Sequence, residues 1–178
     1  MPRGGRPSAP PDRPNAPWRA LLCAAGRAVR PRLILMNFDT RVGAYGVIVR
    51  DGAVLLARWT ESGIPRWTLP GGGLELGEDA PSAAVREIAE ETGYTAELGR
   101  LLGVDSKFIP AERRLHGAGR PLHALRIIYS ATVTGGELAH ELDGSTDEAR
   151  WFALEEVAAL DRLDLVDEGL RLLGSENT

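Results

Sequence analysis

Three glutamates, Glu87, Glu90 and Glu91, follow a run of glycines, Gly71-Gly72-Gly73. On a helix, positions i, i+3 and i+4 share one face, where like charges repel by about a few tenths of a kcal/mol per pair. Clustered carboxylate oxygens are the ligands that Mg²⁺ or Mn²⁺ requires. The spacing therefore indicates a site for a divalent cation. The alternative is a solvated acidic face.

A helix over residues 82–92 would present these glutamates. Pro81 suits the first turn of this helix, and Gly93 suits its C-terminal cap. Val85 and Ile88 lie on an apolar stripe that would dock on a core. The glycines before the helix lack a Cβ, so the backbone there can approach a metal or a phosphate closely.

The segment from Gly72 to Tyr94 resembles the Nudix box in full. Gly72 is followed after five residues by Glu78, and after seven more by Arg86-Glu87-Ile88-Ala89-Glu90-Glu91-Thr92-Gly93-Tyr94. The lead-in from Trp67 to Gly73 and the run Arg150-Trp151-Phe152 are also similar to Nudix sequences. The resemblance covers roughly residues 37 to 173, and the chain is identified by it as a member of the Nudix hydrolase family.

The resemblance implies an α+β fold, a Nudix-type α/β/α sandwich with a mixed β-sheet. The residue patterns predict strands at 44–49, 53–59, 67–69, 98–104, 122–133 and 151–152, and helices at 82–92, 154–160 and 166–173. Asp51-Gly52 predicts a two-residue hairpin turn. Strands and helices mix without βαβ alternation, which argues against a doubly wound sheet.

The resemblance also assigns roles within the box. It implies that Glu87 and Glu91 bind Mg²⁺ or Mn²⁺, that Glu90 is a third ligand or helps to activate the attacking water, and that the Gly71 carbonyl touches metal. Arg86 belongs with the catalytic group and is expected, like Glu78, to orient the glutamates by salt bridges. Glu78 and Gly93 are structural parts of the motif.

Candidates outside the box come from a late acidic stretch, Glu141 to Glu148, and a basic one. Asp147 and Glu148 are candidates for the general base, with solvated loop acids as the alternative. The basic stretch has Arg113, Arg114 and Arg120, which could bind a phosphate or ribose together with Gly72 and Gly73. A solvated loop is again the alternative. Trp59 and Trp67 could stack on a base or lie in the core.

The resemblance implies hydrolysis of a nucleoside diphosphate linked to another group, by water attack at phosphorus. Pro110 stands sixteen residues after Tyr94, a feature of the ADP-ribose pyrophosphatase branch, so ADP-ribose or a nucleotide sugar is the first expectation. The alternative is a (d)NTP pyrophosphohydrolase that sanitises the nucleotide pool. A non-catalytic nucleotide-sensing module is the rival class, although the complete glutamate set favours catalysis. A homodimer is also compatible with this branch.

Charge and composition divide the chain. Residues 1–32 hold seven arginines and one acid, a net +6, so the rest carries −10 of the total −4. We expect residues 1–36 to be a disordered or dispensable Pro/Arg-rich extension, with a membrane-surface or partner-binding arm as the alternative. A Nudix domain at 37–173 and a tail at 174–178 would follow.

The acidic body argues against nucleic-acid binding. No apolar run approaches the ~18 residues of a membrane span, and the single cysteine, Cys23, cannot form an intramolecular disulfide. A cytoplasmic protein with a small nucleotide substrate and no membrane partner is expected.

Overall fold

The computed structural model describes residues 37–115, 119–141 and 144–175. The proposed extension at 1–36 and residues 176–178 lie outside these ranges. The strands are β1 (Asp39–Arg50), β2 (Ala53–Trp59), β3 (Arg66–Thr68), β4 (Gly71–Gly73), β5 (Tyr94–Ile109), β6 (Leu122–Gly136) and β7 (Thr146–Ala153). The helices are α1 (Ala80–Thr92) and α2 (Asp164–Gly174), and the 3₁₀ turns are η2 (Ala111–Arg113) and η3 (Val157–Ala159).

The strands form one mixed sheet in the order β3-β2-β1-β6-β5, with β4 paired to β1 and β7 paired to β2. Strand β1 runs parallel to β6 and antiparallel to β2 and β4. The turn between β1 and β2 has positive φ at both Asp51 (51°) and Gly52 (76°), as the two-residue hairpin requires. The prediction of an α+β fold with a mixed sheet is confirmed.

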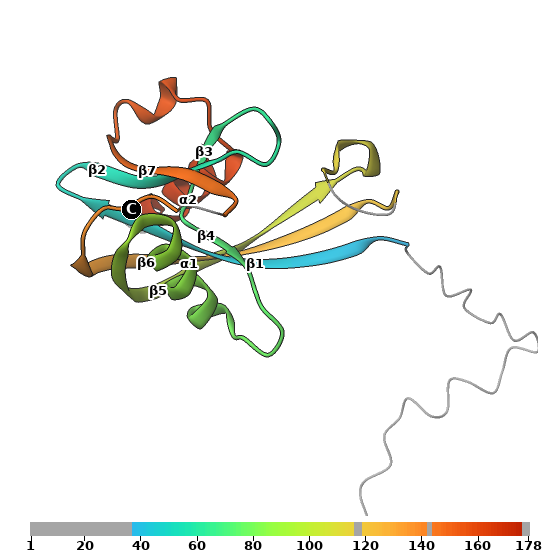
Figure 1. The fold of residues 1–178 in the computed structure, drawn as a ribbon, viewed down its shortest axis with the longest axis horizontal. Helices are drawn as coiled ribbons and strands as arrows, with labels where there is room; N and C mark the ends of the chain where they lie inside the picture. Colours follow the sequence, from blue (N-terminus) through green and yellow to red (C-terminus); the bar gives the residue numbers. More distant parts are fainter. Residues whose placement is uncertain (1–36, 116–118, 142–143, 176–178) are drawn as a thin grey trace, which may run out of the picture. The chain divides into compact units, whose positions relative to one another are not determined.

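Successive residues of β1 pack on opposite faces of the sheet, as a strand's two-residue period dictates. Ile48 packs in the cluster that holds Ile88 of α1. Val47 packs in the cluster that holds Leu165 and Val166 of α2. The two helices therefore cover opposite faces of the sheet (Figure 1), which is the predicted α/β/α arrangement.

The β5–β6 hairpin and the start of β1 extend beyond the helices as a three-stranded ribbon (Figure 1). Val104 and Phe108 of β5 are exposed there. The turn η2 lies in the connection that joins β5 to β6. Among the described residues, no helix is both long enough and apolar enough to cross a membrane.

Two expectations need correction. A helix at 154–160 is wrong, because only the 3₁₀ turn η3 forms there. Its one buried residue is Val157, and so short a segment with one anchor cannot sustain an α-helix. Asp147 and Glu148 lie in strand β7 rather than in a loop.

Candidate active site

Helix α1 begins and ends where its local chemistry requires. The Asp79 side chain accepts a hydrogen bond from the Ser82 N–H (2.8 Å) and caps the N-terminus. Gly93, with φ of 72°, closes the C-terminus, and its N–H donates to the Ala89 carbonyl (2.9 Å). Ala83, Ala84 and Ile88 are buried, which fixes the rotation of the helix about its axis and so the direction of the glutamates.

Strand β4 pairs with β1, and helix α1 packs on both strands. Gly43, Ala44 and Tyr45 of β1 pair with Gly73, Gly72 and Gly71. Gly71 has φ of 141°, a conformation that side chains disfavour. A Cβ on Gly72 would lie 2.5 Å from Oε1 of Glu87, so this glycine admits the Glu87 carboxylate against the strand.

Polar groups of β4 bind side chains of α1. The Gly71 N–H donates to Oε2 of Glu91 (2.9 Å), and the Gly73 carbonyl accepts from Nη2 of Arg86 (3.1 Å). The strand thereby holds one acid and one base of the box in place. It also brings Gly71, Gly72 and Gly73 next to the glutamates, as the sequence predicted.

Glu91 is the most buried acid of the site, with only 2% of its surface exposed. No ion pair joins it to a Lys, Arg or His within the described part of the chain. Burial is the main cause that raises the pKa of Glu91 to about 8. The N–H of Gly71 opposes this rise, while Glu87 and Glu141 add to it.

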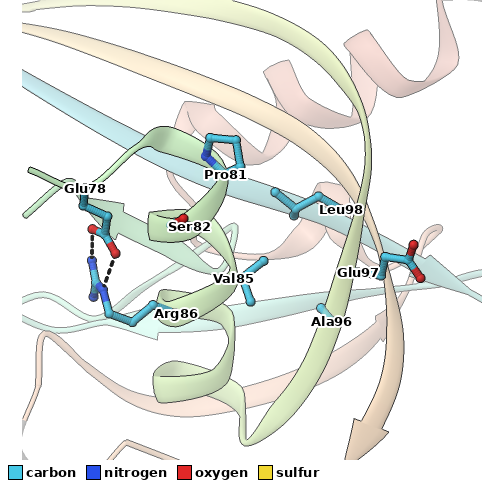
Figure 2. Close-up of a pocket in the computed structure, with 8 residues that line it drawn as sticks. All are labelled: Glu78, Pro81, Ser82, Val85, Arg86, Ala96, Glu97 and Leu98. Carbon is cyan, nitrogen blue, oxygen red and sulfur yellow. Dashed lines mark hydrogen bonds and ion pairs between the residues drawn. The ribbon is translucent and has the colours of Figure 1, made fainter.

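Arg86 organises the other acids. Its guanidinium donates two hydrogen bonds of 2.9 Å to Glu78, which Figure 2 shows. It also lies 3.0 Å from Oε1 of Glu87 and 2.9 Å from Oε2 of Glu90. Arg86, followed by the Glu75 N–H, lowers the pKa of Glu78 to about 2. Burial raises the pKa of Glu87 despite the neighbouring Arg86.

The chemistry of these acids suits a hard divalent cation. Every candidate ligand is an oxygen, and Glu91 is a buried acid, beside Glu87 and Glu141, without a cationic partner. As the described side chains stand, no three His, Cys, Asp or Glu residues form a ready-made metal site. Arg86 instead holds oxygens of Glu87 and Glu90, and Gly71 holds one of Glu91.

In the late acidic stretch, Glu141 lies near the box, rather than the predicted Asp147 or Glu148. Asp147 and Glu148 both pair with Arg58, at 2.8 Å each. Glu141 is the acid close enough to raise the pKa values of Glu87 and Glu91. It accepts a hydrogen bond from the Thr146 hydroxyl (2.8 Å). Glu141 is the first residue of the predicted stretch, but its place beside the box depends on how the chain folds back.

The arginines of the basic stretch differ in their partners. Arg114 donates to Asp39 (2.6 Å), and Arg120 pairs with the same carboxylate. Arg113 and Arg114 both line a cavity of about 470 Å³, together with Trp59. Trp67 packs edge-on against Phe152, with ring centroids 4.6 Å apart, and belongs to the core.

A second hollow, an open groove of about 690 Å³, lies between α1 and the start of β5. Figure 2 shows its lining, in which Glu78 and Arg86 meet the apolar side chains Pro81, Val85 and Leu98. Glu87, Glu90 and Glu91 do not line this groove. The acids therefore face β4 and the late acidic segment rather than this hollow.

The structure thus combines an acid-rich helix packed on a glycine strand with an α/β/α sandwich. The sequence matches the NUDIX domain over residues 39–171. The chain therefore belongs to the NUDIX family, as the box predicted.

Curated relatives share part of the chain. An 8-oxo-(d)GTP phosphatase of Mycolicibacterium smegmatis is 38% identical over 102 residues, which cover 57% of this chain and 27% of that protein. The human diphosphoinositol polyphosphate phosphohydrolase 3-alpha is 37% identical over 111 residues, which cover 60% of this chain and 58% of that protein. The chain thus spans less than two thirds of the length of these relatives.

Solved structures agree with the fold. A NUDIX hydrolase from Nitrosomonas europaea superposes with a TM-score of 0.64 at 26% identity, covering 76% of this chain and 88% of that one. A MutT NUDIX hydrolase from Burkholderia pseudomallei has a TM-score of 0.56 at 32% identity, covering 66% and 85%.

Proposed function

We propose that the protein hydrolyses the diphosphate linkage of a nucleotide by attack of water at phosphorus, with Mg²⁺ or Mn²⁺ as cofactor. The observation that carries this proposal is Glu91, a buried acid without a cationic partner that lies beside Glu87 and Glu141. NUDIX hydrolases generally use divalent metal ions. The bound metal would neutralise the diphosphate and lower the pKa of the attacking water.

Within the box, Glu87 and Glu91 are the proposed metal ligands, assisted by Glu90 and the Gly71 carbonyl. On metal binding, the carboxylate oxygens of Glu87 and Glu90 that contact Arg86 would turn toward the metal. Arg86 keeps them in reach through contacts of 3.0 and 2.9 Å, and Glu78 anchors Arg86 in turn. Arg86 and Glu78 are thus positioning residues.

Glu141 is the acid best placed to take the proton of the attacking water, in preference to Asp147 or Glu148. It is near enough to influence both Glu87 and Glu91, and the Thr146 hydroxyl orients its carboxylate. Asp147 and Glu148 instead form ion pairs with Arg58. Glu141→Gln should therefore lower kcat by about 10²–10⁴-fold, while Asp147→Asn should change it little.

The proposed substrate is a purine (d)NTP or its oxidised form. Support comes from the 8-oxo-(d)GTP phosphatase of Mycolicibacterium smegmatis, whose 38% identity spans 102 residues. ADP-ribose or a nucleotide sugar is the second candidate. It rests on Pro110, which directly precedes the η2 turn whose Arg113 lines the cavity.

The test is a panel of nucleotides with Mg²⁺ or Mn²⁺, analysed for products. Pyrophosphate and a nucleoside monophosphate from GTP, dGTP or 8-oxo-dGTP would support the first substrate. AMP and ribose 5-phosphate from ADP-ribose would support the second. No turnover of any compound, with metal binding intact, would replace both with a non-catalytic nucleotide-sensing module.

A further inference from the structure

A cavity of about 470 Å³ opens beside the glycine strand, between the start of β1, the end of β2 and the end of β5. Its volume lies within the range of roughly 300–1,000 Å³ that small-molecule sites occupy. Glu87, Glu90 and Glu91 do not line it. The cavity is therefore a candidate for the part of the substrate that does not react.

The charge of the cavity depends on which of its arginines lack an acidic partner. Asp39 lines the cavity, but Arg114 and Arg120 both pair with its carboxylate. Arg41 and Arg113 also line it, and neither guanidinium has a hydrogen-bond or ion-pair partner within residues 37–115, 119–141 and 144–175. Glu61 is the second acid of the lining. The lining thus holds three arginines (Arg41, Arg113 and Arg114) and two carboxylates, a net positive charge that favours an anionic ligand.

The remaining walls are largely apolar and include one flat aromatic ring. Ile109 and Leu122 contribute aliphatic surface, and Trp59 contributes its indole. The indole N–H of Trp59 donates to Oε2 of Glu61 at 3.3 Å, which satisfies the polar edge of the ring. An aromatic ring among aliphatic side chains suits a planar heterocycle better than a sugar or a polyphosphate alone.

Arg41 joins the cavity to the acidic site. A Cβ on Gly73 would lie 3.3 Å from Nη2 of Arg41, and a Cβ on Gly72 would lie 2.5 Å from Oε1 of Glu87. The Gly73 carbonyl in turn accepts from Nη2 of Arg86 (3.1 Å), whose guanidinium holds Glu87 and Glu90. Gly73 therefore lies between Arg41 and the arginine that binds the acids. A diphosphate at the acids would have its nucleoside end within reach of Arg41.

We propose that this cavity binds the purine nucleoside end of the substrate. Trp59 stacks on the base, Arg113 donates hydrogen bonds to its acceptor edge, and Arg41 binds the phosphate attached to the nucleoside. Arginine is suited to the paired acceptors of a purine such as guanine. The assignment rests on the proposed function for the position of the diphosphate, and it makes Trp59 and Arg113 specificity residues and Arg41 a phosphate ligand.

The test measures binding rather than turnover, with two probes in Mg²⁺. The first is α,β-methylene-GTP, which keeps the base, and the second is methylenediphosphonate, which lacks it. Trp59→Leu and Arg113→Gln should each weaken binding of the first probe by about tenfold and leave the second unchanged. Arg41→Gln should weaken both. Arg171→Gln is the control, because Arg171 is exposed on α2 and does not line the cavity.

Wild-type affinity of Trp59→Leu and Arg113→Gln for α,β-methylene-GTP would overturn the assignment, even if the enzyme hydrolyses nucleotides. Loss of affinity in both variants would support it, even if the panel of substrates shows no turnover. Thermal unfolding of each variant shows whether it is folded. Arg113 is exposed, so its variant remains informative if Trp59→Leu destabilises the protein.

Discussion

At the scale of single residues, Glu91 is buried, which favours its protonated form, yet it must be ionised to bind a metal. It is buried on helix α1 and bound by the Gly71 N–H, and Glu87 and Glu141 are near. Burial without a counter-charge favours the protonated acid, whereas a metal ligand must be ionised. A metal bound at Glu91 would therefore compete with the proton for the same oxygens.

Glu91→Gln should lower kcat by about three orders of magnitude, because it removes a metal ligand worth several kcal/mol of transition-state stabilisation. The fold should survive, since the amide oxygen can still accept from Gly71. Steady-state kinetics with Mg²⁺, alongside circular dichroism, measures both effects. Glu97→Gln, at an exposed acid of β5, is the matched control, and wild-type turnover by Glu91→Gln would refute the role of Glu91.

Glu91 should also make the metal-free protein less stable as the pH rises. Its pKa is about 8 in the folded protein and about 4.3 in the unfolded chain. Between these values the folded state holds a proton that the unfolded state lacks, so the free energy of unfolding falls with pH, by up to about 1.4 kcal/mol per pH unit from this group.

Urea unfolding in EDTA at pH 5.5 and pH 8 measures this slope. Glu91→Gln should reduce the slope and be the more stable protein at pH 8. Equal slopes in the two proteins would show that Glu91 is ionised when buried.

At the scale of elements, β4 and α1 depend on each other. Gly71 and Gly73 bind Glu91 and Arg86, and Gly72 leaves room for Glu87. A three-residue glycine strand has little intrinsic preference to form, so its pairing to β1 and its contacts with α1 hold it in place.

Gly72→Ala should lower kcat by about 10–100-fold, because the new Cβ displaces the Glu87 carboxylate. The carboxylate ends a flexible side chain, so the loss of stability should stay near ~1 kcal/mol. Gly135→Ala, in β6, is the control, because nothing lies within 4 Å of its added Cβ. Kinetics and melting temperatures of both variants compare the effects, and unchanged kcat in Gly72→Ala would remove Glu87 from the metal site.

The sequence predicts elements well where one residue dictates local geometry. Pro81 and Gly93 bracket α1, and Asp51-Gly52 makes the hairpin, because each acts through its own backbone angles. Strand β5 is longer than predicted, and three register shifts between Thr95 and Gly103 interrupt its pairing with β6.

Within the site, too, the sequence predicts what local geometry sets but not what distant contacts set. The box residues are close in sequence, so a helix alone brings Glu87, Glu90 and Glu91 together. Glu141 lies between β6 and β7, distant in sequence from the box, and its position is set by contacts with Thr146 rather than by a local pattern. The pairing of Arg58 with Asp147 and Glu148 likewise spans two strands, which no local pattern reveals.

At the scale of the whole molecule, β1 is the strand on which the sheet is built. It pairs with β2, β4 and β6, and its two faces carry the two helices. The ribbon at the other end of β5 and β6 has no helix over it (Figure 1). Stability should therefore be concentrated around β1.

Hydrogen exchange followed by mass spectrometry should show this gradient. Amides of residues 44–48 should exchange slowest, because they are buried between both layers. Amides at 108–109 and 122–123, at the end of the ribbon beyond the ion pair of Lys107 with Asp164 of α2, should exchange much faster. Uniform protection along β5 and β6 would contradict this expectation.

The parallel pairing of β1 with β6 joins Asp39 to Leu122 and Ile48 to Ala131, residues that lie 83 positions apart along the chain (122 − 39 = 83). During synthesis, the β1–β2 hairpin leaves the ribosome long before its partner strand exists. Val47 and Ile48 then have no β6 beside them, and contacts between such distant segments form slowly. The strand that anchors the folded sheet is therefore the one whose apolar side chains wait longest for their partner strand during synthesis.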